Sequence, residues 1–232
     1  MGVRSRVTLL TVGTRRSHPP GRRFSRARAV LAGALVLGIG GSLTLASWTD
    51  TEYASGSFSA STFTIESNVS NPFSASGAWT VNETAPGATL AFDAGGMYPG
   101  RTVYAPIALR TRAPSMAGTV TLGAASVTDS ATTAPLLSAA LVYRVVRSDV
   151  CNATAFAPGA AFVVGSASAS QPLTTGQAAG GSTVLPAATP TTPGAGVRFC
   201  FEVTLPESAR ANNGLQGRSA TAVWLFSAVS TP

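Results

Sequence analysis

The amino-acid sequence predicts an all-β protein with a single antiparallel β-sandwich over residues 47–232. This region contains many short runs in which apolar and polar residues alternate, and glycine, proline, serine or asparagine separates the runs. No stretch of it has the periodicity of an amphipathic helix. Its 186 residues are enough to bury one sizeable core. We therefore expect one domain of packed antiparallel sheets.

The two clearest strands lie near the C-terminus. At Val197–Leu205, apolar residues alternate with Arg198, Cys200 and Glu202, which predicts a half-buried strand with one polar face. The run Ser219–Val229 is apolar on both faces, so we expect it to be a central strand.

Seven further strands are expected from shorter alternating runs. Pro106 has no amide donor, so the strand that contains it should be an edge strand or carry a bulge. Tyr98-Pro99-Gly100 predicts a turn before that strand. The segments are Ser61–Glu66, Ala78–Asn82, Ala88–Phe92, Arg101–Arg112, Gly118–Leu122, Ser138–Arg147 and Ser182–Leu185. Apart from the last of these, residues 165–196 are rich in serine, alanine, glycine and proline and predict a loose surface loop.

Residues 1–46 have the three-part layout of a secretory signal peptide. A basic region covers residues 1–28 and an uncharged, apolar run covers residues 29–46. Thr44 and Ala46 are the small residues at the −3 and −1 positions, which predicts cleavage before Ser47. An uncleaved membrane anchor is the alternative, because 18 residues lie at the short end of what spans a bilayer. Paired arginines leave both the general secretory and the twin-arginine routes open.

Cys151 and Cys200 are the two cysteines of the chain. An even number of cysteines in an exported protein favours a disulfide. The bond would close a loop of about 50 residues. By loop-closure entropy, such a bond stabilises the folded state by about 4 kcal/mol. Two free thiols are the alternative.

The charge of the chain argues against a nucleic-acid partner. The net charge of +7 comes from the N-terminal region, because eight of the 16 basic residues lie within residues 1–28 and no acidic residue precedes Asp50. Residues 47–232 carry eight arginines against nine carboxylates, a net charge of −1. These arginines are scattered, whereas neutralising phosphates requires clustered cations. The chain has no lysine, which together with its alanine, glycine, threonine and proline content indicates a high-GC, Gram-positive bacterial source.

Two segments resemble the exported proteins whose alternate-type signal peptide is cut by a SipW-like signal peptidase, the group of TasA and camelysin. The first is Thr44-Leu45-Ala46 with Trp48 and Asp50, followed by a stretch from Phe58 to Phe63 at the entry to the first strand. The second is the motif Asn213-Gly214-Leu215-Gln216-Gly217-Arg218-Ser219 before the last strand. The two segments cover about 40 residues, and the alternative is that only the secretion signal is shared.

The resemblance implies a jelly-roll-like sandwich, a signal peptidase of the SipW type as the export partner, and assembly into extracellular matrix fibres for some relatives. Within the motifs, Asn213, Gln216, Gly217 and Ser219 are the residues that match at the C-terminal end. At the N-terminal end, Trp48, Asp50, Phe58 and Phe63 are candidates for strand addition, because a segment freed by cleavage can pair with a neighbour's exposed sheet edge.

The sequence does not favour an enzyme. The one histidine, His18, precedes the predicted cleavage site, and lysine is absent, so the commonest general bases are missing from residues 47–232. No HExxH motif is present to bind zinc, and we expect no metal or other cofactor.

Three functions stay open at this point. The first is an exported cell-surface or matrix structural protein of a biofilm-forming type, a homo-oligomer or fibre that assembles by strand addition. The second is a monomeric secreted binding module or adhesin that uses the loop between Cys151 and Cys200. The third is a membrane-tethered surface protein that keeps its signal segment; in the first two cases the membrane is contacted through that segment alone.

Overall fold

The computed structural model describes residues 22–40, 51–57, 60–92 and 96–231, with the side chains of the first segment described for residues 26–35. The chain divides into two compact units, Met1–Ser57 and Phe58–Pro232. In the first unit, α1 (Arg22–Gly40) is a helix whose described side chains are exposed. Among the residues that the structure describes, no helix combines the length and the apolar character needed to cross a membrane.

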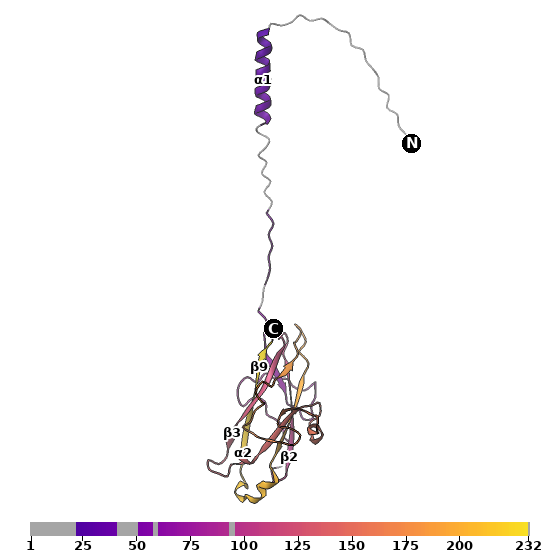
Figure 1. Ribbon diagram of the computed structural model, residues 1–232, viewed down its shortest axis with the longest axis vertical. Helices are drawn as coiled ribbons and strands as arrows, with labels where there is room; N and C mark the ends of the chain where they lie inside the picture. The colour runs from indigo at the N-terminus through magenta and orange to yellow at the C-terminus, as the bar shows by residue number, and fades with distance from the viewer. Residues whose placement is uncertain (1–21, 41–50, 58–59, 93–95, 232) are drawn as a thin grey trace, which may run out of the picture. The chain divides into compact units, whose positions relative to one another are not determined.

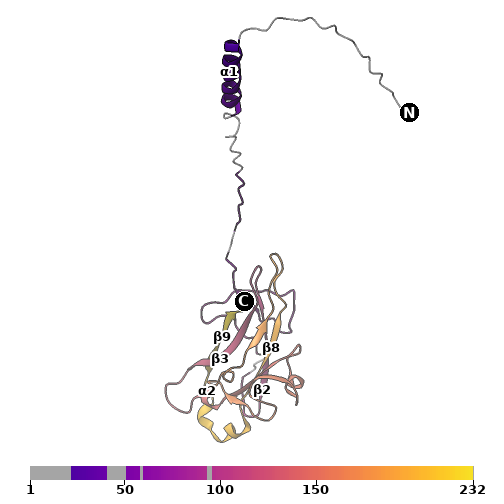
Figure 2. The same cartoon turned by 45° about the horizontal axis from the view of Figure 1, so that its top comes forward.

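The second unit is a sandwich of two antiparallel sheets, which confirms the predicted all-β class (Figure 1). The large sheet has the order β1-β2-β8-β4-β5, and β6 also pairs with β4. The small sheet has the order β7-β3-β9, and β3 and β9 lie side by side in Figure 1 and in Figure 2. The jelly-roll connection stays a prediction. The strands are β1 (Ile65–Asn68), β2 (Thr102–Thr111), β3 (Gly118–Asp129), β4 (Val142–Arg147), β5 (Ala161–Val164), β6 (Gln171–Pro172), β7 (Thr183–Leu185), β8 (Val197–Thr204) and β9 (Ala220–Ser230).

Short helical turns connect several strands. α2 (Leu137–Ala140) precedes β4, and η1 (Ala153–Phe156) precedes β5. Two further turns, η2 (Glu207–Ala211) and η3 (Asn213–Leu215), join β8 to β9. Asn152 caps η1, because its side-chain oxygen accepts a hydrogen bond from the Thr154 amide at 2.9 Å.

Aromatic side chains from both sheets form the centre of the main core. Phe201 of β8 lies 5.1 Å from Trp224 of β9, measured between ring centroids, and Tyr143 of β4 lies 5.6 Å from the same ring. Phe199 and Phe226 pair across the sheets at 5.2 Å. Such edge-to-face and tilted contacts stabilise a core beyond the area that they bury. β8 and β9 therefore hold the sandwich together.

A second, smaller apolar cluster covers the other face of the large sheet. Val146, Ala155, Phe156 and Cys200 are its buried members. The predicted disulfide between Cys151 and Cys200 is present, and it ties the segment after β4 to the outer face of β8. This face of β8 is therefore covered by protein.

The environments of β8 and β9 are the reverse of the expectation. β8 was expected to be half-buried, but Cys200 and Glu202 on its polar face are as buried as the phenylalanines on the other face. β9 was expected to be central, but it lies at the edge of the small sheet, with Leu225 and Val229 each 66% exposed. The alternation of residue types describes the two faces of a strand and does not specify which other segments cover them.

Three other expectations need correction. Residues 165–196 are not a loose loop, because Leu173, Thr183 and Leu185 are buried. In addition, β6 pairs with β4 of the large sheet and β7 pairs with β3 of the small sheet. Residues 78–82 contribute one isolated bridge, Ser67 to Thr80, and residues 88–92 form no strand.

Pro106 lies inside β2, where it is opposite Cys200 of β8. The pairing of β1 with β2 ends at Ala108. β2 is therefore locally an edge strand at Pro106, although β1 lies beside it further along.

Candidate functional site

An apolar cleft of about 720 Å³ opens between β9 and the inner face of the large sheet. Val103, Ile107 and Leu109 of β2 and Phe201 of β8 form its floor. Such a volume lies within the range of sites that hold a ligand or a peptide segment. The floor belongs to the main hydrophobic core, so an apolar group that enters the cleft extends that core.

The cleft runs along one edge of β9. Every residue from Ala220 to Phe226 lines it. Successive residues of a strand point to opposite faces of the sheet, so a wall that includes seven consecutive residues must follow the strand edge. β9 pairs with β3 on its other side and has no second strand neighbour among the described residues. The cleft thus lies where a fourth strand of the small sheet would run.

β9 contains neither charged residues nor proline, the two residue types that commonly protect an exposed edge. Its 11 residues are ATAVWLFSAVS. Natural edge strands are commonly short, charged, bulged or interrupted by proline, because unpaired amides and carbonyls bind other strands. The other edge of the small sheet, β7, has three residues. β9 is therefore the edge of this sheet that is suited to pairing with another strand.

The segment 81–98 covers part of the cleft without pairing with β9. Leu90, Phe92 and Met97 pack against the core from this segment. In its described part, residues 81–92 and 96–98, no residue belongs to a helix or strand. The Phe92 amide donates to the Leu90 carbonyl at 3.2 Å, and the Asn71 side chain donates to the Ala91 carbonyl at 3.0 Å. Its contact with the cleft is therefore made mainly by apolar side chains.

Phe63, one of the predicted strand-addition residues, lies in the cleft of its own domain. A Cβ atom at Gly118 would lie 2.5 Å from two carbons of the Phe63 ring, so only glycine lets the ring approach β3 this closely. The Thr64 amide donates to the Ser115 hydroxyl at 2.9 Å and fixes the chain beside the ring. Phe63 thus helps to form one end of the cleft.

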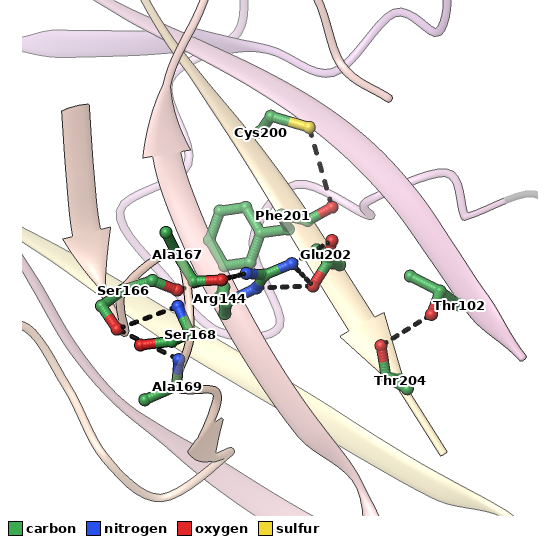
Figure 3. Close-up of polar contacts among 10 residues, drawn as sticks. All are labelled: Thr102, Arg144, Ser166, Ala167, Ser168, Ala169, Cys200, Phe201, Glu202 and Thr204. Atoms are coloured by element: carbon green, nitrogen blue, oxygen red, sulfur yellow. Dashed lines mark hydrogen bonds and ion pairs between the residues drawn. The ribbon is translucent and has the colours of Figure 1, made fainter. Parts of the chain in front are cut away.

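Arg144 and Glu202 on the outer face of the large sheet are engaged in structural contacts (Figure 3). Arg144 of β4 donates to both carboxylate oxygens of Glu202, with Nε to Oε1 at 2.7 Å and Nη2 to Oε2 at 2.9 Å. Its Nη1 donates to the carbonyls of Ser166 and Ala167 at 3.1 and 3.0 Å. Burial raises the pKa of the neighbouring Tyr104, and the charge of Glu202 acts in the same direction. This cluster holds the disulfide-linked layer on the sheet.

The C-terminal motif forms the turn that leads into β9. Gly217 has a φ of +69°, a left-handed conformation that favours glycine. The Ser219 amide donates to the Ser130 hydroxyl at 2.9 Å, and the Ser130 amide donates to the Ser219 carbonyl at 2.8 Å. Asn213 and Gln216 are exposed beside a separate pocket. Two residues of the motif thus shape the backbone and two face solvent.

The structure does not bring all the predicted site residues together. Phe63 reaches the cleft, and Cys151 and Cys200 lie on the opposite face of the large sheet. The remaining predicted positions lie outside the described residues: Thr44, Ala46, Ser47, Trp48, Asp50 and Phe58.

Sequence reasoning missed β9 as a candidate site. The signal was available, because a long apolar strand without charge or proline suits either a central position or an edge that another chain covers.

Comparison with models of known protein families gives no match for this chain, and comparison with curated proteins gives none either.

Proposed function

We propose that the protein is an exported cell-surface or matrix structural protein whose copies assemble by strand addition. The donor is Ser47–Ala60 of one copy, freed when a signal peptidase of the SipW type cuts after Ala46. The acceptor is the unpaired edge of β9 in the next copy. The observation that carries the proposal is this edge: an uncharged strand of 11 residues, of which residues 220–226 line an apolar cleft.

The dimensions of donor and acceptor agree. An 11-residue strand extends about 36 Å at about 3.3 Å per residue, and the 14-residue donor segment can cover that length. Residues 51–57 of the donor are exposed and form no helix or strand, so their backbone groups are available for pairing. Main-chain hydrogen bonds would supply affinity, and alternate side chains would enter the cleft.

The aromatic residues of the donor fit the chemistry of the acceptor. Trp48 and Phe58 carry large apolar side chains, and the cleft floor is made of valine, isoleucine, leucine and phenylalanine. Burying one such side chain contributes about 1.5–3 kcal/mol. Asp50 would stay at the rim, since a carboxylate in an apolar cleft is unfavourable without a partner. Phe63 already occupies its own cleft, so the donor ends before it.

A pair of matched variants tests the acceptor edge. Leu225→Lys places a charge on β9 and Val184→Lys places one on β7, at sites that are 66% and 64% exposed in the same sheet. Because both sites are exposed, each change should alter the stability of the monomer by no more than about 0.5 kcal/mol. We expect Leu225→Lys to prevent assembly and Val184→Lys to leave it intact.

The measurement is negative-stain electron microscopy of the exported protein over a series of concentrations, together with sedimentation. Deletion of Ser47–Ala60 should have the same effect as Leu225→Lys. Filaments from either of these two variants, or isolated particles of the natural protein at every concentration, would refute assembly through β9.

A further inference from the structure

A second pocket lies between the Tyr98 turn and the C-terminal motif, and its chemistry differs from that of the cleft. Its volume is about 480 Å³, within the range of small-molecule sites. Three segments form it: the turn before β2, the residue that follows β8, and the η2–η3 connection. The lining residues that matter here are Tyr98, Arg210, Asn212, Asn213 and Gln216.

The backbone around the pocket is fixed by hydrogen bonds. The Gly100 amide donates to the Leu205 carbonyl at 2.8 Å, and the Leu205 amide donates to the Arg101 carbonyl at 3.1 Å. The Gly214 amide donates to Asn212 Oδ1 at 3.2 Å. The pocket is therefore largely preformed, which lowers the entropic cost of binding.

Side-chain amides dominate its polar groups. Asn213 and Gln216 are exposed, and within the described structure no hydrogen bond engages their side chains. An amide carries two donors on nitrogen and an acceptor oxygen, so it can satisfy a hydroxyl group, which both donates and accepts. A ligand that carries several hydroxyl groups matches this lining.

The pocket presents no unbalanced charge. Arg210 pairs with Glu207 one turn earlier in η2. The Glu207 carboxylate also lies against the backbone of Gly100. A Cβ atom added at Gly100 would lie 2.7 Å from Oε2 of Glu207. A phosphate or uronate would have to compete with this carboxylate for the arginine. An uncharged ligand is therefore favoured.

Tyr98 supplies an aromatic surface at the rim. The residue is 61% exposed, and the Arg101 guanidinium lies 5.5 Å from the ring centroid. An exposed ring beside amide donors offers an apolar plane for the C–H face of a sugar, while the amides contact its hydroxyls.

From these observations we propose that this pocket is a binding site for a neutral saccharide, with Tyr98 as the stacking platform and Asn213 and Gln216 as hydroxyl-binding residues. The site goes beyond the proposed assembly and does not depend on it, because none of its lining residues belongs to β9. A protein that assembles through β9 would have this site left to bind a polysaccharide.

The test is isothermal titration of the exported protein with four neutral oligosaccharides: cellohexaose, laminarihexaose, mannohexaose and chitohexaose in its N-acetylated form. At least one should bind saturably. Tyr98→Ala and Gln216→Ala should each weaken that binding by about five- to tenfold, and Tyr98→Phe should preserve it. Val184→Ala is the control, because Val184 is 64% exposed, lies outside the proposed donor and acceptor segments, and does not line the pocket. Thermal unfolding of each variant separates a lost site from a lost fold.

Three results would overturn the site: no binding of any of the four sugars at millimolar concentration, binding that Tyr98→Ala and Gln216→Ala both leave unchanged, or displacement of the neutral sugar by oligogalacturonate. The Leu225→Lys variant should bind the sugar as the natural protein does. Because Leu225→Lys changes β9 and not the pocket, its sugar binding tests the saccharide site separately from assembly.

Discussion

Residues 165–196 and residues 81–98 are both long connections rich in alanine, glycine, threonine and proline, yet they differ in how they meet the sandwich. In the first, the Gln177 amide donates to the Leu122 carbonyl at 2.8 Å, and the Leu173 carbonyl accepts from Ala125 at 3.0 Å. Leu173 and Leu185 are buried in the main core. In the described part of the second, apolar side chains reach the core while the backbone pairs with no strand.

The difference shows that covering a sheet edge requires backbone hydrogen bonds as well as side-chain packing. Both connections place leucine side chains on the core. Residues 165–196 also satisfy backbone groups of β3, whereas the described part of residues 81–98 satisfies none. A connection that supplies side chains alone leaves the neighbouring strand edge unpaired. β9 is in that position beside residues 81–98, and this is why we assign the acceptor edge to it.

The largest expected effect comes from the disulfide, whose 49-residue sequence separation encloses residues 165–196 and leaves residues 81–98 outside. Replacing Cys151 and Cys200 with alanine should lower the free energy of unfolding by about 4 kcal/mol, because the unfolded chain gains the freedom of the opened loop. Urea unfolding of the oxidised protein and the double variant measures this. A loss below about 1 kcal/mol would show that the covalent loop does not stabilise this side of the sandwich.

Matched leucine substitutions compare the two connections directly. Leu185→Ala should cost about 2–5 kcal/mol, because Leu185 is fully buried and its removal leaves a cavity. Leu90→Ala should cost about 1 kcal/mol, since Leu90 is partly exposed at the cleft. The readout is again the free energy of unfolding in urea. If the two variants lost the same free energy of unfolding, residues 165–196 and residues 81–98 would not differ in how strongly they pack on the core.

Alkaline pH should loosen residues 165–196 through Tyr143. Its hydroxyl donates to the Thr175 carbonyl, and burial raises its pKa above the ordinary value of 10.0. Tyr143 therefore ionises at lower pH in the unfolded chain than in the folded protein. Its contribution to stability is fully present below pH 10 and is lost as the pH rises through the folded pKa. The pKa of Tyr104 is raised as well and contributes the same sign.

Denaturant unfolding between pH 8 and pH 11 should show this loss, and Tyr143→Phe should reduce it. The phenylalanine variant also loses the bond to Thr175, so it should begin from a lower stability at pH 8, by about 1 kcal/mol. If the stability of Tyr143→Phe depended on pH in the same way as that of the natural protein, ionisation of Tyr143 would not be the cause of the loss.

The sequence predicted the fold class, the disulfide, and the strands that became β2, β7, β8 and β9. It failed where the outcome depends on which segments become neighbours. The polar face of β8 is buried because Arg144 neutralises Glu202 and the disulfide brings a covering layer over it. Cys200 on that face was the available signal, since its partner had to lie above the same side of the strand.

The cleft and the saccharide pocket could not be predicted in the same way. Leu90 and Phe92 alternate as in a strand, but within the described structure their backbone forms no ladder with a strand, and the Phe92 amide donates to the Leu90 carbonyl instead. Their side chains are partly buried against the core without strand pairing. Tyr98 and Gln216 are more than 100 residues apart in the sequence and share a pocket only through the pairing of β2 with β8.

The most direct test of the account is hydrogen exchange of the purified protein, compared between its isolated and assembled forms. Alternate amides of an edge strand point away from its partner and exchange freely until another strand pairs with them. We predict that assembly protects residues 220–226 and leaves the exchange of residues 171–185 unchanged. Assembled protein in which residues 220–226 exchange as fast as in the isolated form would contradict strand addition at β9.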